Sequence, residues 1–265
     1  MAEQSDATET ATTEYRPVKT VLISQPKPER SPYFDIEQKW GVKIDWRPFI
    51  HVEGVEAKEF RKQTVYLEEY SALIFTSRGA IDHFFRLAEE MRFSVSDDLH
   101  YYCISEAVAN YLQKFINYRK RKVFIGEKTV EQFKPVLRKG KDKEKFLLPL
   151  SNLGKKDLTA FLEEEGFDAT EAMMYRTVAS DLSDLTEVFY DVLVFFSPLG
   201  ITSLYENFPT WQQGDTRLAI FGKHTSAAVD EHGLRIDIPA PSPEAPSMPM
   251  ALEKYLEKSN KRRRR

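Results

Sequence analysis

Short apolar runs alternate with amphipathic segments along most of this chain. The run at 18–24 is rich in β-branched residues and is closed by a proline-containing loop, which predicts a buried strand. A helix at 32–39 and a strand at 42–49 complete a predicted β-α-β unit. The same alternation continues to residue 175, and a second series begins after about residue 180.

The later segments repeat this scheme. We expect strands at 72–76, 101–104, 122–125, 145–150, 169–175, 192–196, 217–221 and 234–238. We expect helices at 57–67, 79–91, 107–115, 130–137, 156–164, 201–206, 225–232 and, after a proline-rich loop, 251–258. Strands and helices that alternate at this spacing imply an α/β fold with parallel sheets covered by helices on both faces.

Two segments of the chain resemble each other. Tyr70–Phe85 and Tyr190–Tyr205 align without gaps, and Ser77 then falls on Ser197. Each serine ends an apolar strand and directly precedes a helix. Because a further strand–helix pair follows each segment, the chain reads as two related α/β halves.

Composition narrows the classes of protein that fit. The 265 residues suggest one large or two medium domains, at about 150 residues per domain. A formal net charge of −3 argues against a general nucleic-acid binder, although a local cleft can still be positive. The single cysteine, Cys103, excludes an intrachain disulfide and lies in an apolar run, so we expect a buried strand residue.

Both ends of the chain are polar. Residues 1–13 are acidic with no apolar stretch, which predicts neither a signal peptide nor a transit peptide, and no apolar run approaches the roughly 20 residues needed to span a bilayer. We therefore expect a cytoplasmic protein. The basic cluster at 261–265 is interpreted as a solvated terminus rather than a nucleic-acid signal.

The strand–helix turns are the candidate binding elements. In a parallel sheet the ligand lies at the carboxyl ends of the strands, where helices present free N–H groups and a positive dipole end. Small polar residues stand at these turns, namely Thr76, Ser77, Ser151, Asn152, Ser197, Gly222 and Thr225. Each one alone is equally well explained as a helix cap. As a set they would suit a ligand with many carboxylates.

Other chemistries lack their patterns. There is no G-x-x-x-x-G-K-[ST] or G-x-G-x-x-G for a nucleotide, no H-E-x-x-H for a metal and no G-x-S-x-G for a hydrolase. The Asp and Glu residues are spread over predicted helices as solvated faces. An enzyme without these motifs must work by positioning, charge stabilisation and proton donation.

At this point the chain resembles the uroporphyrinogen-III synthase family. The matching motifs run in the family's order over about residues 18–256. They are Val21-Leu22-Ile23-Ser24 with Pro26, Ile74-Phe75-Thr76-Ser77-x-x-Ala80-Ile81, Leu158-x-x-x-Leu162-x-x-x-Gly166 leading to Tyr175, Phe196-Ser197-Pro198, and Gly222-Lys223-His224-Thr225-Ser226-Ala227 with Gly233.

The resemblance implies two doubly wound parallel-sheet domains joined by a two-stranded linker. The first domain would combine 18–48 with 179–258, and the second would span 52–174. The linker strands would lie near 48–53 and 175–180. A disordered tail at 1–17 and a basic tail at 259–265 would flank them.

It also implies an activity. The substrate would be hydroxymethylbilane, a linear tetrapyrrole with eight carboxylates, on which the domains close. The enzyme would expel the terminal hydroxyl, invert ring D through a spiro intermediate and close the macrocycle, as a monomer, without cofactor or metal. Tyr175 aligns with the family tyrosine that assists departure of the hydroxyl. The binding residues would be Thr76, Ser77, Arg78, Ser151, Asn152, Ser197, Gly222, Lys223 and Thr225.

The chain departs from the family pattern in its first half. Ser105 and Val108 stand where members often keep Gly and Thr, and Arg78-Gly79 replaces a more usual polar pair. These departures leave open a catalytically degenerate member that binds a tetrapyrrole or a protein. A more distant alternative is a two-lobed binding protein of the periplasmic type, against which the missing signal peptide counts.

Overall fold

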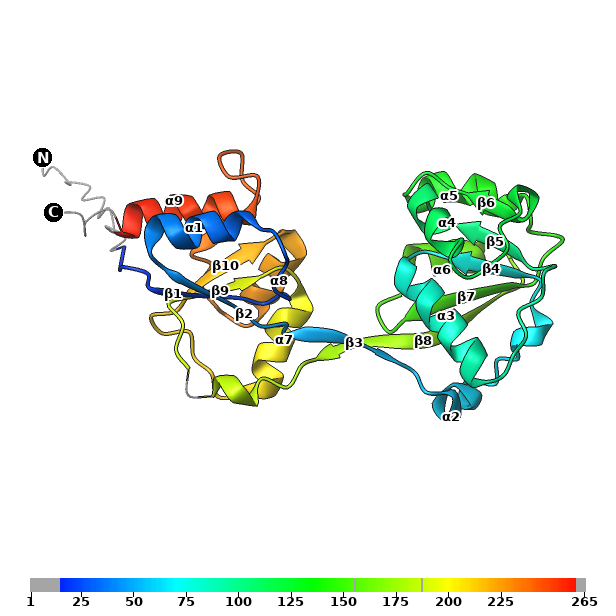
Figure 1. Ribbon diagram of the computed structural model, residues 1–265, viewed down its shortest axis with the longest axis horizontal. Coiled ribbons are helices and arrows are strands. Elements are labelled where there is room, and N and C mark those ends of the chain that lie inside the picture. Colours follow the sequence, from blue (N-terminus) through cyan, green and yellow to red (C-terminus); the bar gives the residue numbers. More distant parts are fainter. Residues whose placement is uncertain (1–14, 155, 187, 261–265) are drawn as a thin grey trace, which may run out of the picture. The chain divides into compact units, whose positions relative to one another are not determined.

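The computed structural model describes residues 15–154, 156–186 and 188–260, and it divides into two compact units (Figure 1). Unit 1 combines Met1–His51 with Ala179–Arg265, and unit 2 is Val52–Val178. The expected tails at 1–14 and 261–265 lie outside the described residues. At its other end the basic tail was placed too early, because residues 259 and 260 complete the last helix.

Unit 1 is built on a five-stranded parallel sheet. Its order is β11-β10-β9-β1-β2. The strands are β1 (Thr20–Ile23), β2 (Lys43–Trp46), β9 (Val192–Phe195), β10 (Arg217–Phe221) and β11 (Ile238–Ala240). Counted along the unit this is the doubly wound order 2-1-3-4-5, which reverses between β1 and β9.

Helices cover both faces of this sheet. They are α1 (Pro32–Trp40) and α9 (Met248–Asn260) on one face, and α7 (Pro198–Asn207) and α8 (Lys223–Glu231) on the other (Figure 1). The alternation of side chains along β1 explains both layers. Val21 and Ile23 belong to the core beneath α1 and α9, whereas Leu22 belongs to the core beneath α7 and α8.

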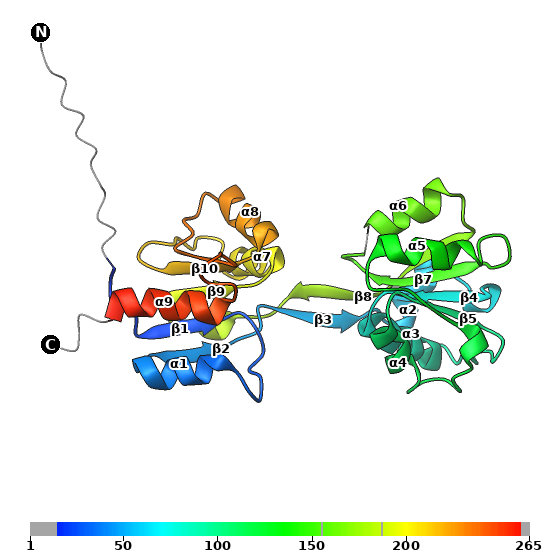
Figure 2. The same cartoon turned by 90° about the horizontal axis from the view of Figure 1, so that it is seen from above.

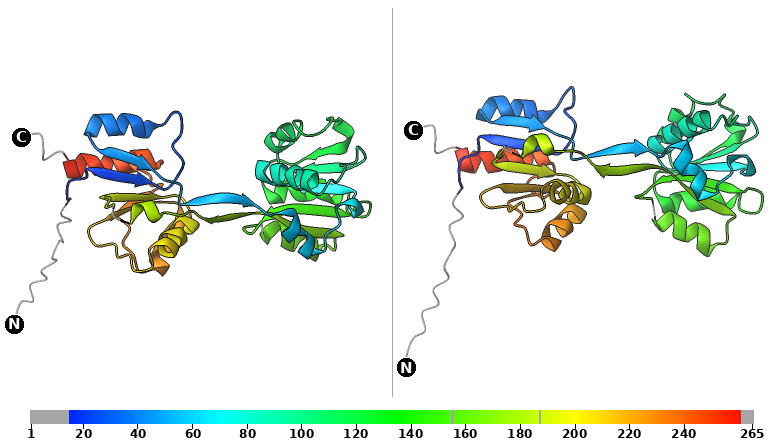
Figure 3. Two further views of the ribbon diagram at one scale, coloured as in Figure 1. Left: turned by 60° about the horizontal axis from the view of Figure 1, so that its bottom comes forward. Right: turned by 90° about the horizontal axis from the view of Figure 1, so that it is seen from below.

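Unit 2 contains a six-stranded sheet of order β3-β8-β7-β4-β5-β6. The strands are β3 (Ile50–Gly54), β4 (Ala72–Phe75), β5 (His100–Cys103), β6 (Val123–Ile125), β7 (Phe146–Ser151) and β8 (Ala169–Ala179). The chain enters this unit within β3 and leaves it within β8, and Figure 3 shows these two strands side by side. Without β3, the order is 3-2-1-4-5 along the unit, and it reverses between β4 and β7.

The helices of unit 2 also form two layers. On one face of the sheet lie α3 (Arg78–Glu90) and α4 (Glu106–Leu112), and on the other lie α5 (Val130–Arg138) and α6 (Lys156–Glu164) (Figure 2). The short α2 (Ala57–Phe60) and several 3₁₀ turns complete the unit. The predicted α/β class, with parallel sheets covered on both faces, is confirmed.

Two predicted elements were wrong. The helix expected at 57–67 ends as an α-helix at Phe60 and continues as a 3₁₀ turn, because Thr64 adopts a left-handed backbone with φ 54°. The strand expected at 234–238 begins only at Ile238. The side-chain oxygen of Gln213 accepts a hydrogen bond from the main-chain N–H of Arg235 at 2.7 Å, and this contact holds the segment before β11 as a loop.

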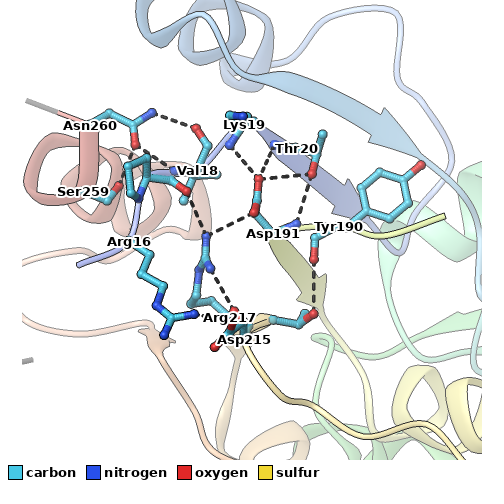
Figure 4. Close-up of polar contacts among 12 residues, drawn as sticks. Arg16, Val18, Lys19, Thr20, Tyr190, Asp191, Asp215, Arg217, Ser259 and Asn260 are labelled. Atoms are coloured by element: carbon cyan, nitrogen blue, oxygen red, sulfur yellow. Dashed lines mark hydrogen bonds and ion pairs between the residues drawn. The ribbon is translucent and has the colours of Figure 1, made fainter. Parts of the chain in front are cut away.

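A partly buried polar network joins the amino ends of the unit 1 strands (Figure 4). The carboxylate of Asp191 accepts hydrogen bonds from the main-chain N–H groups of Lys19 and Thr20, at 2.7 and 3.0 Å. It lies 3.6 Å from the guanidinium of Arg217, whose side chain is 7% exposed. The amide of Asn260, the last residue of α9, pairs with both main-chain polar groups of Val18 at 2.9 Å.

We predict that Asp191→Ala destabilises unit 1 by about 3 kcal/mol, since it leaves the Arg217 guanidinium buried without its counter-charge. All three tryptophans, at 40, 46 and 211, belong to unit 1, so tryptophan fluorescence during urea unfolding reports on this unit. Asp184→Ala is the control. The side chains of Asp184 and of its partner Arg47 are 57% and 38% exposed, and we expect a loss below about 1 kcal/mol. Equal losses for the two variants would contradict the prediction.

Candidate active site

Unit 2 has a cavity of about 150 Å³ where its strand order reverses. Thr76 and Ser77, which follow β4, line one side, and Ser151, which ends β7, lines another. Tyr175 reaches the cavity from β8, and Leu158 of α6 adds apolar surface. The cavity therefore lies at the carboxyl ends of the strands and at the switch point, where a doubly wound sheet opens a crevice for ligands.

Tyr175 reaches this cavity because of an irregularity between β7 and β8. Leu150 pairs with Met173, but the next residue, Ser151, pairs with Tyr175, so Met174 is an extra residue on β8. Glu171 lies on the α6 face, where it accepts a hydrogen bond from Thr159. On a regular strand Tyr175 would share that face. The bulge instead directs its ring to α3, where it stacks on His83. Figure 2 shows α3 on the face of the sheet opposite α6.

Ser77 connects the tyrosine to the start of α3. It is the N-cap residue, and its Oγ accepts a hydrogen bond from the main-chain N–H of Ala80 at 3.0 Å. The same Oγ lies 3.2 Å from Tyr175 Oη. Because Ser77 Oγ already accepts a hydrogen bond from Ala80, the hydroxyl proton of Ser77 is available for donation to Tyr175 Oη. In that arrangement the phenolic proton is free for a ligand in the cavity, close to the positive end of the helix dipole.

Gly79 of α3 lies beside the ring of Tyr175. A Cβ atom added at Gly79 would lie 3.7 Å from the ring, which is an ordinary van der Waals contact, so alanine would also fit at this position. Arg78 itself lies over the ring of Tyr111 at 5.5 Å, and the hydrogen bond that Tyr111 donates to Asp82 raises the pKa of Tyr111.

The structure brings together some of the expected site residues and separates others. Thr76, Ser77, Ser151 and Tyr175 line the same cavity. Asn152 lies beside a neighbouring cavity, and its amide pairs with both main-chain polar groups of Thr177 at 2.9 and 3.1 Å. The Asn152 side chain thus fastens β8 to the end of β7.

The remaining expected residues belong to unit 1. Ser197 is the N-cap residue of α7, without a side-chain cap hydrogen bond to the described residues of that helix. Gly222 precedes α8 at φ 88°, a conformation that glycine adopts without strain, and Lys223 begins the helix at the surface. Thr225 is only 2% exposed, so any contribution from this turn to binding would come from its neighbours and its main-chain N–H groups.

Cys103 is the buried strand residue that its apolar surroundings predicted. It lies in β5 with 0% exposure, and burial raises the pKa of its thiol to about 12. A thiol in this state is not a nucleophile at neutral pH. Within the described residues, no group of three His, Cys, Asp or Glu side chains is arranged to hold a metal ion.

Sequence reasoning missed two residues beside the tyrosine. His83 stacks on its ring, and Arg86 contacts His83 one turn further along α3. His83 follows Gly79 by four residues and Arg86 follows His83 by three, so all three lie on one helical face, which is the available signal. This spacing does not by itself indicate a contact with Tyr175. The contact depends on the bulge, which places Tyr175 opposite the same helical face.

Comparison with known proteins settles the family. The family model described as uroporphyrinogen-III synthase HemD matches residues 37–249, which is most of the chain. This chain belongs to the uroporphyrinogen-III synthase family. A search of curated proteins found no match.

Two solved structures share the fold. Uroporphyrinogen-III synthetase from Helicobacter pylori has a TM-score of 0.55 at 17% identity, and a mutant uroporphyrinogen III synthase from Thermus thermophilus has 0.53 at 16%. Each comparison covers 91% of this chain and 99% of the other. None of the helices in the described ranges has both the length and the apolar character to cross a membrane.

We predict that Ser77→Ala lowers the stability of unit 2 by about 2 kcal/mol, since it removes a helix cap and the hydrogen bond to Tyr175, each worth about 1 kcal/mol. Ser105→Ala is a matched control. Ser105 caps α4 in the same way, through Val108, so we expect only about 1 kcal/mol. Thermal unfolding followed by circular dichroism measures both, and equal losses would show that Ser77 does not bond to Tyr175.

Proposed function

We propose that this chain is a uroporphyrinogen-III synthase. It takes hydroxymethylbilane, expels the terminal hydroxyl as water, inverts ring D through a spiro intermediate and closes the macrocycle. The family match over residues 37–249 supports this proposal. The observation that carries it is local: a tyrosine hydroxyl lies in a cavity at the switch point of unit 2, within 3.2 Å of a serine at a helix N-terminus.

Tyr175 is the proposed proton donor to the departing hydroxyl. A neutral phenol donates a hydrogen bond to an oxygen and yields its proton as the C–O bond breaks. The negative charge that then develops on Oη is stabilised by Ser77 and by the positive end of α3. Water departs and carbon–carbon bonds form with no net oxidation or reduction, so the proposed reaction balances without a cofactor.

The turns at the strand ends are the proposed carboxylate sites. In unit 2 they are Thr76, Ser77, Arg78, Ser151 and Asn152, and in unit 1 they are Ser197, Gly222, Lys223 and Thr225. Free N–H groups at the first turns of α3, α7 and α8 supply donors that need no positive side chain, which suits a protein of net charge −3. We further propose that the enzyme acts as a cytoplasmic monomer and binds no nucleic acid.

The identity of the product isomer tests the proposed function. Hydroxymethylbilane is supplied to the purified chain, and the type III product is resolved from the type I isomer that forms spontaneously. A type III product that increases with enzyme concentration is the expected result. If only the type I isomer forms, the chain is not a synthase, and a binding protein of the same fold is the remaining interpretation.

We predict that Tyr175→Phe lowers kcat by about 100-fold, at the lower end of what general acids contribute, because positioning of the substrate remains. The variant should unfold only a few degrees below the wild-type temperature, since it loses the hydrogen bond to Ser77, worth about 1 kcal/mol, but retains the ring and its packing. Tyr66→Phe is the control, because Tyr66 lies in the same unit with 57% exposure. A wild-type rate for Tyr175→Phe would show that another group protonates the leaving hydroxyl.

A further inference from the structure

The ring of Tyr175 is covered by a histidine. The imidazole of His83 lies nearly parallel to it, with 4.7 Å between the ring centroids and 12° between the planes. His83 comes from the middle of α3, six residues after the N-cap Ser77 that contacts Tyr175 Oη. One helix therefore holds the tyrosine at two points, its hydroxyl through Ser77 and its ring face through His83.

Arg86 holds the histidine in place. Its Nε donates a hydrogen bond to His83 Nδ1 at 3.4 Å. Its Nη2 donates to the main-chain carbonyls of Val55 at 2.7 Å and of Met174, the bulge residue next to Tyr175, at 3.4 Å. A Cβ atom at Gly54 would lie 2.7 Å from this guanidinium, so the glycine leaves room for it. The support of His83 thus extends to the backbone that carries Tyr175.

The hydrogen bond from Arg86 requires a lone pair on His83 Nδ1, which the neutral imidazole provides. Burial lowers the pKa of His83, and the positive charge of Arg86 lowers it further, while Asp82 opposes them. The groups facing His83 are thus Arg86 and Asp82 on α3 and the phenol of Tyr175 on β8. At neutral pH the ring on Tyr175 is a flat, neutral surface.

We propose that His83 is a positioning residue for Tyr175. By stacking on the phenol it restricts rotation of the tyrosine side chain about its Cα–Cβ bond, so that Oη stays beside Ser77 and its proton stays directed into the cavity. This inference rests on the proposed function of Tyr175. Its physical basis is that small errors in the placement of a reacting group are costly, and a 1 Å displacement can reduce a rate by about 100-fold.

The test compares His83→Ala, which removes the stacked ring, with His83→Phe, which keeps a flat aromatic ring. We expect His83→Ala to lower kcat by about 10-fold with KM within about twofold, because substrate contacts remain and only the orientation of Tyr175 is lost. His83→Phe should recover most of kcat. In a Tyr175→Phe background, His83→Ala should have almost no further effect on kcat, because the hydroxyl that it positions is gone.

His232→Ala provides a matched control. His232 stacks on Tyr205 in unit 1 with 4.4 Å between centroids and 14° between planes, and neither residue lines the cavity of unit 2. We expect its kcat to match the wild-type value. Circular dichroism and thermal unfolding of each variant identify any loss of kcat that merely reflects unfolding.

The outcomes separate this inference from the proposed function. If the wild-type chain forms no type III product, the proposed function fails, and the inference fails with it. If the wild-type chain is active and folded His83→Ala keeps its kcat, only the inference fails. Loss of kcat in His83→Phe equal to that in His83→Ala would also overturn it, since the histidine would then act through its nitrogen atoms rather than as a stacked surface.

Discussion

The extra residue in β8 decides what unit 2 can do. Because Ser151 pairs with Tyr175 and not with Met174, the tyrosine faces α3 rather than α6. Everything in the candidate site depends on this register shift, which brings the phenol to a helix N-terminus, to a serine hydroxyl and to a histidine ring. A β-bulge changes the direction of one side chain without changing the sheet, and it costs one unpaired residue.

Hydrogen bonds to the residues around the bulge offset this loss of regular strand pairing. Arg86 donates to the carbonyl of Met174, and the amide of Gln63 pairs with both main-chain polar groups of Met173 at 2.8 and 2.9 Å. Asn152 does the same for Thr177. The main-chain N–H of Val55 also donates to the Met174 carbonyl, at 2.9 Å, so polar side chains from α3, from the 3₁₀ turn after α2 and from the end of β7 supplement the main-chain bonds of this irregular segment.

The sheet of unit 1 divides its tasks between the two ends of its strands. At the amino ends, Asp191 and Arg217 form a partly buried ion pair, Asp191 also binds the main-chain N–H groups that enter β1, and a nearby amide of α9 binds Val18 (Figure 4). At the carboxyl ends lie the turns that open a helix. The reason is geometric. Helices that connect parallel strands begin at the carboxyl ends of the strands, so their positive dipole ends gather there, and the amino ends of the strands are left for structural contacts.

The sequence by itself determined the elements, the α/β class and the family, because hydrophobic period, turn residues and ordered motifs are local properties. It also indicated Tyr175 and Ser77 as candidates, each from its own neighbourhood. It did not predict the loop before β11, the shortened α2, or the roles of His83 and Arg86. Only the tertiary structure decided these, since they follow from the pairing of β7 with β8 and from the face of α3 that this pairing meets. A shift of one residue in register turns a side chain to the other face, and no local pattern in this sequence marks it.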